Sequence, residues 1–353
     1  MWMSSWLCYS LYTLFALNKV PNYWTGKIAS DERVVFFPTA ANKINSTHWN
    51  VPVHGWIFEP ELESKKRRAL IKALEKVFKI ENEEEKRILK QRVMPFTVDN
   101  KSMKYMKINI GNVSHRLPRS KKNGHFKVDL TLDENELNFH SSMNDNHDNT
   151  VTFEAVDDKE RTFPGLIHLI SHTGISIVSD IDDTVKISNY LDKKEFYRNT
   201  FTREFEAVPG MVQLFQNFQS KYENCHFHYV SAAPYQLFEE LYKFFQNAGF
   251  PPATFHLKKI RVKDKTLLQL LADPLDYKLG QIEPLLKTYP NRKFIFIGDS
   301  GEKDPEVYSE LFAKYPSQIE KIWIRNVNNA TAARMDGVHP DRWQYFDDGT
   351  CFE

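Results

Sequence analysis

The hydrophobic pattern of the chain changes near residue 165, and no other feature constrains the fold as strongly. Before this point, apolar residues mostly alternate with polar ones. The clearest example runs from Phe126 to Leu132, where every second residue is apolar directly after the Asn123–Gly124 turn signal. Alternation with a period of two indicates strands that bury one face. We therefore predict a small antiparallel β domain, arranged as a sandwich, with one helical insertion at about residues 63–92.

After residue 165, continuous apolar runs are separated by segments long enough to form helices. The runs are Ile175–Val178, Phe227–Val230, Phe294–Ile297 and Ile322–Ile324. Strands that are apolar on both faces are typical of a parallel sheet covered by helices on both sides. The predicted fold is therefore α/β: a parallel sheet with helices on both faces, preceded by the antiparallel β domain.

The length and the overall charge narrow the class of protein. A chain of 353 residues suits two domains, which we place at residues 29–162 and 163–353, after a hydrophobic N-terminal segment at residues 1–28. Lys and Arg total 47 and Asp and Glu total 46, so the overall charge gives no indication of nucleic-acid binding. Cys8, Cys225 and Cys351 are too far apart for a disulfide framework or a zinc cluster, and they suit a reducing compartment.

The first 18 residues contain no charged side chain. The segment is shorter than a membrane-spanning helix requires, and it lacks the basic start and the cleavage site of a typical signal peptide. Three interpretations remain open: packing on the body of the protein, contact with a membrane interface through its Trp and Tyr rings, or removal as a signal.

Acidic and small polar residues follow the predicted strands of the second half. The first strand ends in Asp180-Ile181-Asp182-Asp183-Thr184, the second in Ser231-Ala232-Ala233-Pro234, and the third in Gly298-Asp299-Ser300-Gly301 with Asp304 close behind. Ligands of open parallel sheets bind at the carboxyl ends of the strands. We therefore expect these side chains at one edge of the sheet, with Lys278 reaching them from the start of a helix.

This set of side chains favours phosphoryl-transfer chemistry. Clustered carboxylates repel one another, and a divalent cation with oxygen ligands relieves the repulsion; Mg²⁺ also keeps room for water and substrate phosphate. A carboxylate can act as a nucleophile, and a lysine and a serine can hold phosphate oxygens. Each motif alone is common in ordinary loops, but their order and their placement at strand ends are not. His226 and His228 share one face of a strand, and without a nearby acid we interpret them as core or rim residues rather than zinc ligands.

The motifs resemble those of the haloacid dehalogenase superfamily, and within it the App1-type phosphatidate phosphatase family. The resemblance rests on Ser179 to Lys186, Pro209-Gly210-Met211, His228 to Pro234 and Gly298 to Tyr308, and in the N-terminal half on Val34 to Thr39, Gly55-Trp56 and Asn123 to Phe126. It implies a haloacid dehalogenase-like catalytic domain at residues 163–353 and an accessory β domain before it.

The resemblance also implies a role for each site residue. Asp180 would attack phosphorus, and Asp182 would act as general acid and base. Thr184 would orient the loop, and Ser231 and Lys278 would hold the phosphoryl oxygens. Asp180, the backbone carbonyl of Asp182, Asp299 and Asp304 would hold Mg²⁺, with Asp304 either a ligand or a residue that orients one. Asp183 points the other way on an extended segment, so we expect it to have a structural role.

The function expected from the resemblance is Mg²⁺-dependent hydrolysis of phosphatidate to diacylglycerol and phosphate through an aspartyl-phosphate intermediate. Two alternatives remain: a phosphatase for a soluble or protein-bound phosphomonoester, and a non-catalytic membrane or protein adaptor. The short insert at about residues 188–209 predicts a small flap that leaves the site open to a lipid headgroup. We expect a cytoplasmic protein that contacts membranes peripherally, with residues 1–18 as a candidate contact.

Overall fold

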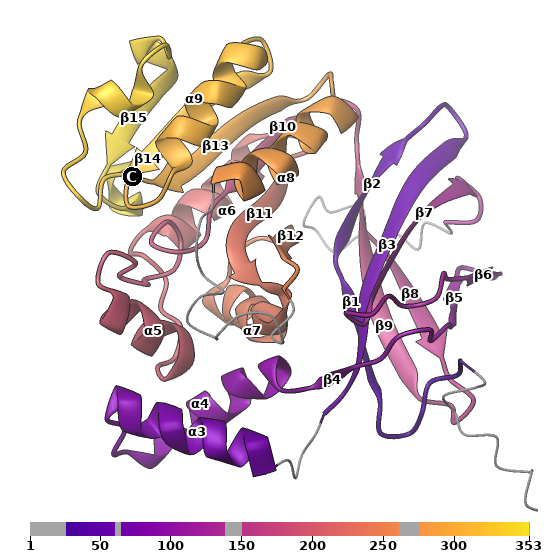
Figure 1. Ribbon diagram of the computed structural model, residues 1–353. Helices are drawn as coiled ribbons and strands as arrows, with labels where there is room; N and C mark the ends of the chain where they lie inside the picture. Colours follow the sequence, from indigo (N-terminus) through magenta and orange to yellow (C-terminus); the bar gives the residue numbers. More distant parts are fainter. Residues whose placement is uncertain (1–25, 61–64, 138–149, 261–274, 353) are drawn as a thin grey trace, which may run out of the picture.

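The computed structural model describes residues 26–60, 65–137, 150–260 and 275–352, which fold around two sheets (Figure 1). The interpretations of residues 1–18 lie outside these ranges. Within them, every helix is too short or too polar to cross a lipid bilayer.

The first sheet has nine strands, all from the first half of the chain. They are β1 (Arg33–Phe37), β2 (Thr39–Lys43), β3 (His48–Glu59), β4 (Asp99–Asn100), β5 (Lys107–Ile110), β6 (Val113–Arg116), β7 (His125–Asp133), β8 (Thr150–Val156) and β9 (Thr162–Ile170). Their pairing is antiparallel except between β2 and β9. The strands form one continuous sheet, because the long strand β3 pairs with β1, β2, β4 and β7. Their apolar residues pack into one cluster, and the sandwich stays a prediction.

Alternation explains the core of this sheet. In β8, Val151, Phe153 and Ala155 are buried while the residues between them are exposed. Ile108 and Ile110 on β5 pack into the same apolar cluster. Strand β9 belongs to this sheet as far as Ile170, so the sheet extends beyond the boundary predicted at residue 162.

The second sheet is the predicted parallel one. Its strands are β10 (Ile175–Ser179), β11 (His226–Pro234), β12 (Ala253–Lys258), β13 (Lys293–Asp299), β14 (Ile319–Arg325) and β15 (Trp343–Phe346), in the order β12-β11-β10-β13-β14-β15. Every pair is parallel. The sequence prediction missed β12 and β15, the two edge strands.

Helices cover both faces of this sheet, as predicted. Helices α6 (Met211–Lys221) and α7 (Phe238–Ala248) pack on the face that contains Ile177 and Tyr229. Helices α8 (Leu275–Thr288) and α9 (Asp304–Lys314) pack on the face that contains Val178. A shorter helix, α5 (Lys193–Phe201), lies in the insert after β10. The 3₁₀ turns are η1 (Met94–Phe96), η2 (Tyr235–Leu237), η5 (Ala332–Met335), η6 (Pro340–Arg342) and η7 (Gly349–Phe352).

The helical insertion of the first half consists of two helices rather than one. Helix α3 (Lys65–Phe78) ends before Lys79, whose φ of 51° breaks the helix, and α4 (Glu83–Val93) begins after the N-cap Asn82. Both helices bury their apolar residues in the core of the second half of the chain, and they lie beside α5 and α7 in Figure 1. Buried Arg92 donates to the carbonyls of Thr200 and Arg203 in the insert after β10.

Candidate active site

Three strand ends meet at one edge of the parallel sheet, as the sequence predicted. Strand β10 lies between β11 and β13, with Ser179 paired to Tyr229 on one side and Ile297 on the other. Asp180 directly follows β10, Ser231 lies in β11 and Asp299 ends β13. Lys278 joins them from the first turn of α8.

Lys278 is the centre of a buried charge cluster. Its side chain has no exposed surface, and its Nζ lies 2.8 Å from Oδ1 of Asp180 and 2.9 Å from Oε2 of Glu302. The same nitrogen donates to Oδ1 of Asp304. The pKa of Lys278 is raised well above its usual value, because the attraction of Asp180, Asp304 and Glu302 outweighs the opposing effect of burial. Lys278 is therefore charged, and it balances only part of the negative charge around it.

Three of these acids could hold a divalent cation. Asp180, Asp299 and Asp304 each offer one carboxylate oxygen, and the three oxygens lie within 4.8 Å of one another. Oδ2 of Asp299 is buried and accepts no hydrogen bond from the described residues, whereas Oδ1 of Asp180 contacts the Lys278 ammonium. An all-oxygen set with a free acceptor atom suits a hard cation such as Mg²⁺. The side chain of Asp182 is not part of this set.

Asp182 belongs to a neighbouring polar group. Its Oδ1 lies 2.7 Å from Nζ of Lys186 and accepts a 2.7 Å hydrogen bond from the Ser188 hydroxyl. Its Oδ2 accepts a longer 3.4 Å bond from the Ser231 hydroxyl. Burial would raise the pKa of Asp182, but Lys186 and Ser188 outweigh burial and lower it.

The pKa values of Asp180 and Asp299 shift in the opposite direction. Burial raises the pKa of Asp180 well above its usual value; Lys278 opposes this, and Asp304 and Glu302 add to it. The pKa of Asp299 is also raised, first by burial and then by Asp304 and Glu302. In the protein alone Asp180 and Asp299 thus tend to keep protons while Asp182 loses its own. A cation bound beside Asp180 would reverse the first of these tendencies.

The loop after β10 is held by Asp183 and Thr184. Asp183 has a φ of 56°, and its carboxylate accepts backbone N–H bonds from Ser188, Asn189 and Tyr190 at 2.8, 2.8 and 2.5 Å. These bonds support the structural role predicted for Asp183. The hydroxyl of Thr184 donates to Oδ2 of Asp180 at 3.2 Å, which fits its predicted orienting role.

The loop after β13 is equally constrained. The backbone N–H groups of Gly301 and Glu302 donate to Oδ1 of Asp299, and the N–H of Asp299 donates to Oδ2 of Asp304. A Cβ atom on Gly298 would lie 2.4 Å from that Asp304 oxygen. Only glycine therefore allows Asp304 to approach the strand end this closely.

The sequence prediction missed three site residues. Glu302 contacts Lys278, and Lys186 and Ser188 contact Asp182. All three lie within or next to the motifs that were recognised, but in a loop a charged or hydroxyl residue is usually solvated. The signal that could have identified them was their position inside these two loops.

Part of the chain that contains this site is similar to known proteins. Residues 175–326 match the family described as "Phosphatidate phosphatase APP1, catalytic domain". This segment of the chain is similar to the App1 catalytic-domain family. The match begins with β10 and ends just after β14, so it contains Asp180, Asp182, Thr184, Ser231, Lys278, Asp299 and Asp304.

Two yeast relatives match the chain over about half of its length. "Phosphatidate phosphatase APP1" of Saccharomyces cerevisiae is 34% identical over 176 residues, which are 49% of this chain and 29% of the relative. An uncharacterised protein of Schizosaccharomyces pombe is 31% identical over 169 residues, which are 46% of this chain and 26% of the relative. The chain thus matches less than a third of either relative, and the accessory β domain implied by the resemblance stays a prediction.

Proposed function

We propose that the protein is a Mg²⁺-dependent phosphatidate phosphatase. One observation supports the proposal: in the segment that matches the App1 family, carboxylate oxygens of Asp180, Asp299 and Asp304 lie within 4.8 Å of one another, and Lys278 contacts two of these acids. The name of the S. cerevisiae relative supports phosphatidate as the substrate.

In the first proposed step, a carboxylate oxygen of Asp180 attacks the phosphorus atom. The bond between phosphorus and the glycerol oxygen breaks, Asp182 protonates that oxygen, and diacylglycerol leaves. Asp182 needs a proton at this point, although Lys186 and Ser188 lower its pKa in the protein alone. The negative charge of the arriving phosphate raises the pKa of Asp182 and favours the protonated acid.

In the second step, water attacks the phosphorus of the aspartyl-phosphate. Asp182, now a carboxylate, accepts the proton of the water, and the acyl-phosphate bond breaks to give inorganic phosphate and the free Asp180 carboxylate. Lys278 lies 2.8 Å from Asp180 and would balance charge on the phosphoryl oxygens, and Ser231 would donate to one of them. Mg²⁺ held by Asp180, Asp299 and Asp304 would supply charge that keeps Asp180 ionised and stabilises the phosphoryl group.

The shape of the insert after β10 supports a lipid substrate. It contains only a loop and α5, and Leu191 in that loop is 56% exposed. An ideal Cβ on Gly301 would lie 3.6 Å from the Leu191 side chain, so this apolar residue lies over the loop that follows β13. An exposed apolar side chain beside the site suits a membrane surface.

The proposal is tested by phosphate release from phosphatidate in phosphatidylcholine vesicles, with Mg²⁺ and with a chelator. We expect release only with Mg²⁺, and a loss of at least about a thousandfold in Asp180→Asn, which keeps the shape of the side chain but not its charge. The control is Asp341→Asn, a change at an exposed acid far along the chain from these motifs. Full activity with the chelator, or in Asp180→Asn, would rule out the mechanism.

The alternative substrate class is tested in the same assay. A panel of soluble phosphomonoesters replaces the vesicles at matched phosphate concentration. Faster turnover of a soluble ester than of vesicle-borne phosphatidate would support the proposed phosphatase reaction but contradict phosphatidate as the substrate.

A further inference from the structure

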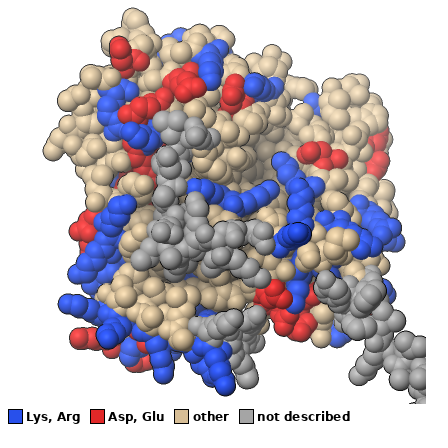
Figure 2. Space-filling model, viewed as in Figure 1, with Lys and Arg blue, Asp and Glu red and all other residues tan. Residues whose placement is uncertain are grey.

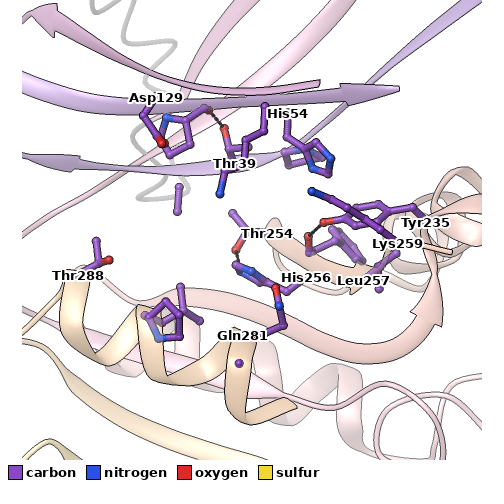
Figure 3. Close-up of a pocket in the computed structure, with 18 of the residues that line it drawn as sticks. Thr39, His54, Asp129, Tyr235, Thr254, His256, Leu257, Lys259, Gln281 and Thr288 are labelled. Atoms are coloured by element: carbon purple, nitrogen blue, oxygen red, sulfur yellow. Dashed lines mark hydrogen bonds between the residues drawn. The ribbon is translucent and has the colours of Figure 1, made fainter. Parts of the chain in front are cut away.

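A large cavity lies between the two sheets, away from the acidic cluster. Its volume is about 870 Å³, and it is lined by β2, β3 and β7 of the first sheet and by β12 and α8 of the second half. None of Asp180, Asp182, Lys278 and Asp299 lines it. Figure 3 shows its walls, with His54 and Asp129 on one side and His256 and Gln281 on the other.

Lysines dominate the charge of this cavity. Lys127, Lys258 and Lys259 line it, against a single acid, Asp129. In the part of the chain that the structure describes, neither Lys127 nor Lys259 makes an ion pair with a carboxylate. In Figure 2, Lys or Arg side chains border the hollow between the two halves of the molecule. Lys127 and Lys259 therefore bring positive charge to the cavity without an ion pair to an acid of the described protein.

The electrostatic effects of these lysines are visible in their neighbours. The pKa of Lys259 is lowered by partial burial and then by the charges of Lys127 and Lys121. Burial and then the charge of Lys259 lower the pKa of His54. Figure 3 shows the Lys259 side chain reaching into the cavity between His54 and His256. Cations that repel one another across an open cavity are stabilised by an anion.

Neutral groups complete a binding surface. Tyr277 lines the cavity, and its buried hydroxyl has no hydrogen-bond partner among the described residues. Gln281 and Thr288 on α8 add further polar side chains, and Pro38 and Leu257 contribute apolar wall. The volume is within the range of small-molecule sites, about 300–1,000 Å³, and is much larger than a single phosphate ion needs.

We propose that this cavity binds an anionic phosphate ester, with the phosphate against Lys127 and Lys259 and the organic part along the apolar wall. The phosphate would receive charge-assisted hydrogen bonds from both lysines and from the Tyr277 hydroxyl. Lys127 comes from the first sheet, whereas Lys259 and Tyr277 come from the second half of the chain, so the ligand would link the two. This site is separate from the catalytic one and does not depend on the proposed function.

The test is the protection of individual lysines from an amine-acetylating reagent, measured by mass spectrometry on the full chain with a chelator present. One probe is glycerol 3-phosphate, and the other is phosphatidate in phosphatidylcholine vesicles. At probe concentrations well above the Kd, we expect acetylation of Lys127 and Lys259 to fall at least about fivefold. Lys107, exposed on β5, is the internal control and should react at an unchanged rate.

The two probes distinguish the source of the phosphate. Protection by glycerol 3-phosphate alone supports a soluble ester, and protection by phosphatidate vesicles alone supports a lipid. Protection by both supports the shared phosphate. Equal protection by phosphatidylcholine vesicles without phosphatidate, equal protection of Lys107, or no protection of Lys127 and Lys259 would each overturn the proposal.

A variant provides a second measurement. Lys127→Ala combined with Lys259→Ala should weaken binding of the protecting probe at least about tenfold, as followed by acetylation of Lys258. Lys107→Ala is the matched control and should bind as the wild type does. Unchanged binding in the double variant would also overturn the proposal, whatever its catalytic activity.

Discussion

Lys278 shows how single residues shape this site. A lysine with no exposed surface is costly to bury, and here contacts to Asp180, Glu302 and Asp304 compensate the cost. One cation cannot neutralise three carboxylates and the adjacent Asp299, so the cluster carries excess negative charge whenever these acids are ionised. That excess favours a bound divalent cation and destabilises the protein when no cation is present.

The excess charge leads to a prediction for Glu302, the acid that the sequence prediction missed. Glu302→Gln removes one negative charge beside Lys278 and keeps the shape of the side chain. With a chelator at neutral pH, we expect the free energy of unfolding in urea to rise by on the order of 1 kcal/mol, because repulsion within the cluster falls. Added Mg²⁺ should stabilise this variant less than it stabilises the wild type.

The control for this prediction is Glu320→Gln at an exposed position of β14. It should change neither the stability nor the response to Mg²⁺. A marked loss of stability in Glu302→Gln would mean that the charge of Glu302 is needed to balance Lys278. The cluster would then have no excess negative charge.

The sequence predicted those site residues whose place at the end of a strand determines which other residues they meet. Asp180, Ser231 and Asp299 were predictable, because the carboxyl ends of adjacent parallel strands must meet. The contacts of Glu302 with Lys278 and of Lys186 with Asp182 were not, because they depend on how two loops fold back. The pKa shifts could not be predicted from the sequence either, because they follow from burial that only the packed structure shows.

At the scale of elements, the loop before α5 exposes Leu191 to solvent beside the site. If the substrate is a membrane lipid, Leu191 should insert at the bilayer surface while the headgroup enters the site. Leu191→Asp should then lower kcat/KM for vesicle-borne phosphatidate about tenfold, because it loses apolar contact and repels anionic lipid. Turnover of a soluble phosphomonoester should change little.

The matched control is Ile44→Asp, which places the same charge at another exposed apolar residue, at the end of β2. It should leave both activities near the wild-type values. Equal losses on vesicle and soluble substrates in Leu191→Asp would instead indicate a distorted site.

Arg292 secures the connection between the two sheets. It is almost fully buried, and it donates to the Ser176 hydroxyl at 2.9 Å and to the carbonyls of Ser171, Thr173 and Asn224 at 3.0, 2.8 and 2.6 Å. Arg292→Met fills similar space but leaves these acceptors without a donor. We expect the free energy of unfolding in urea to fall by at least about 3 kcal/mol.

The comparison is Arg68→Met, at an exposed position of α3. Its unfolding midpoint should stay within error of the wild type. A loss in Arg292→Met no larger than in this control would show that water replaces the lost donors.

The central elements were easier to predict than the edge elements. Strands β10, β11 and β13 are mostly buried on both faces, because helices cover both sides, and their apolar runs stand out. Strand β12 is a short edge strand in which Thr254 and His256 interrupt the apolar pattern, and β15 lies where we expected only chain-end packing. The break between α3 and α4 depends on the backbone at Lys79, which the charged sequence around it does not reveal.

At the scale of the whole molecule, the sequence indicated two sheets but not how they pack. The amphipathic pattern of α3 and α4 predicts that they bury one face; it does not say that this face meets the core of the other half of the chain. The sequence also does not show that a row of buried histidines lies between the two halves. His168 of β9 lies 4.9 Å, ring to ring, from His226, which lies 4.7 Å from His228 on the same strand. The prediction that His226 and His228 are core residues fits their burial.

These histidines predict how stability depends on pH. Burial lowers the pKa of His168 to about 4, and it lowers the pKa of His226 and His228 well below the usual value. Below about pH 6.5 the unfolded chain binds protons that the folded protein excludes, so the stability that these residues contribute above that pH is lost as the pH falls. Each histidine can contribute a slope of up to about 1.4 kcal/mol per pH unit.

The raised pKa values of Asp180 and Asp299 act in the opposite direction, because protons bound only by the folded protein stabilise it as the pH falls. A variant therefore has to isolate the histidine contribution. Neither ring nitrogen of His168 has a hydrogen-bond partner in the described protein, so His168→Phe removes the titrating group without breaking a bond. Urea unfolding at a series of pH values between about 7.5 and 5.5 should show a shallower acid loss in His168→Phe than in the wild type. The control is His172→Phe at an exposed position, which should leave the dependence of the unfolding free energy on pH unchanged. The same pH dependence in the wild type and in His168→Phe would contradict the prediction, because it would show that His168 accepts protons without opening the contact between the two halves.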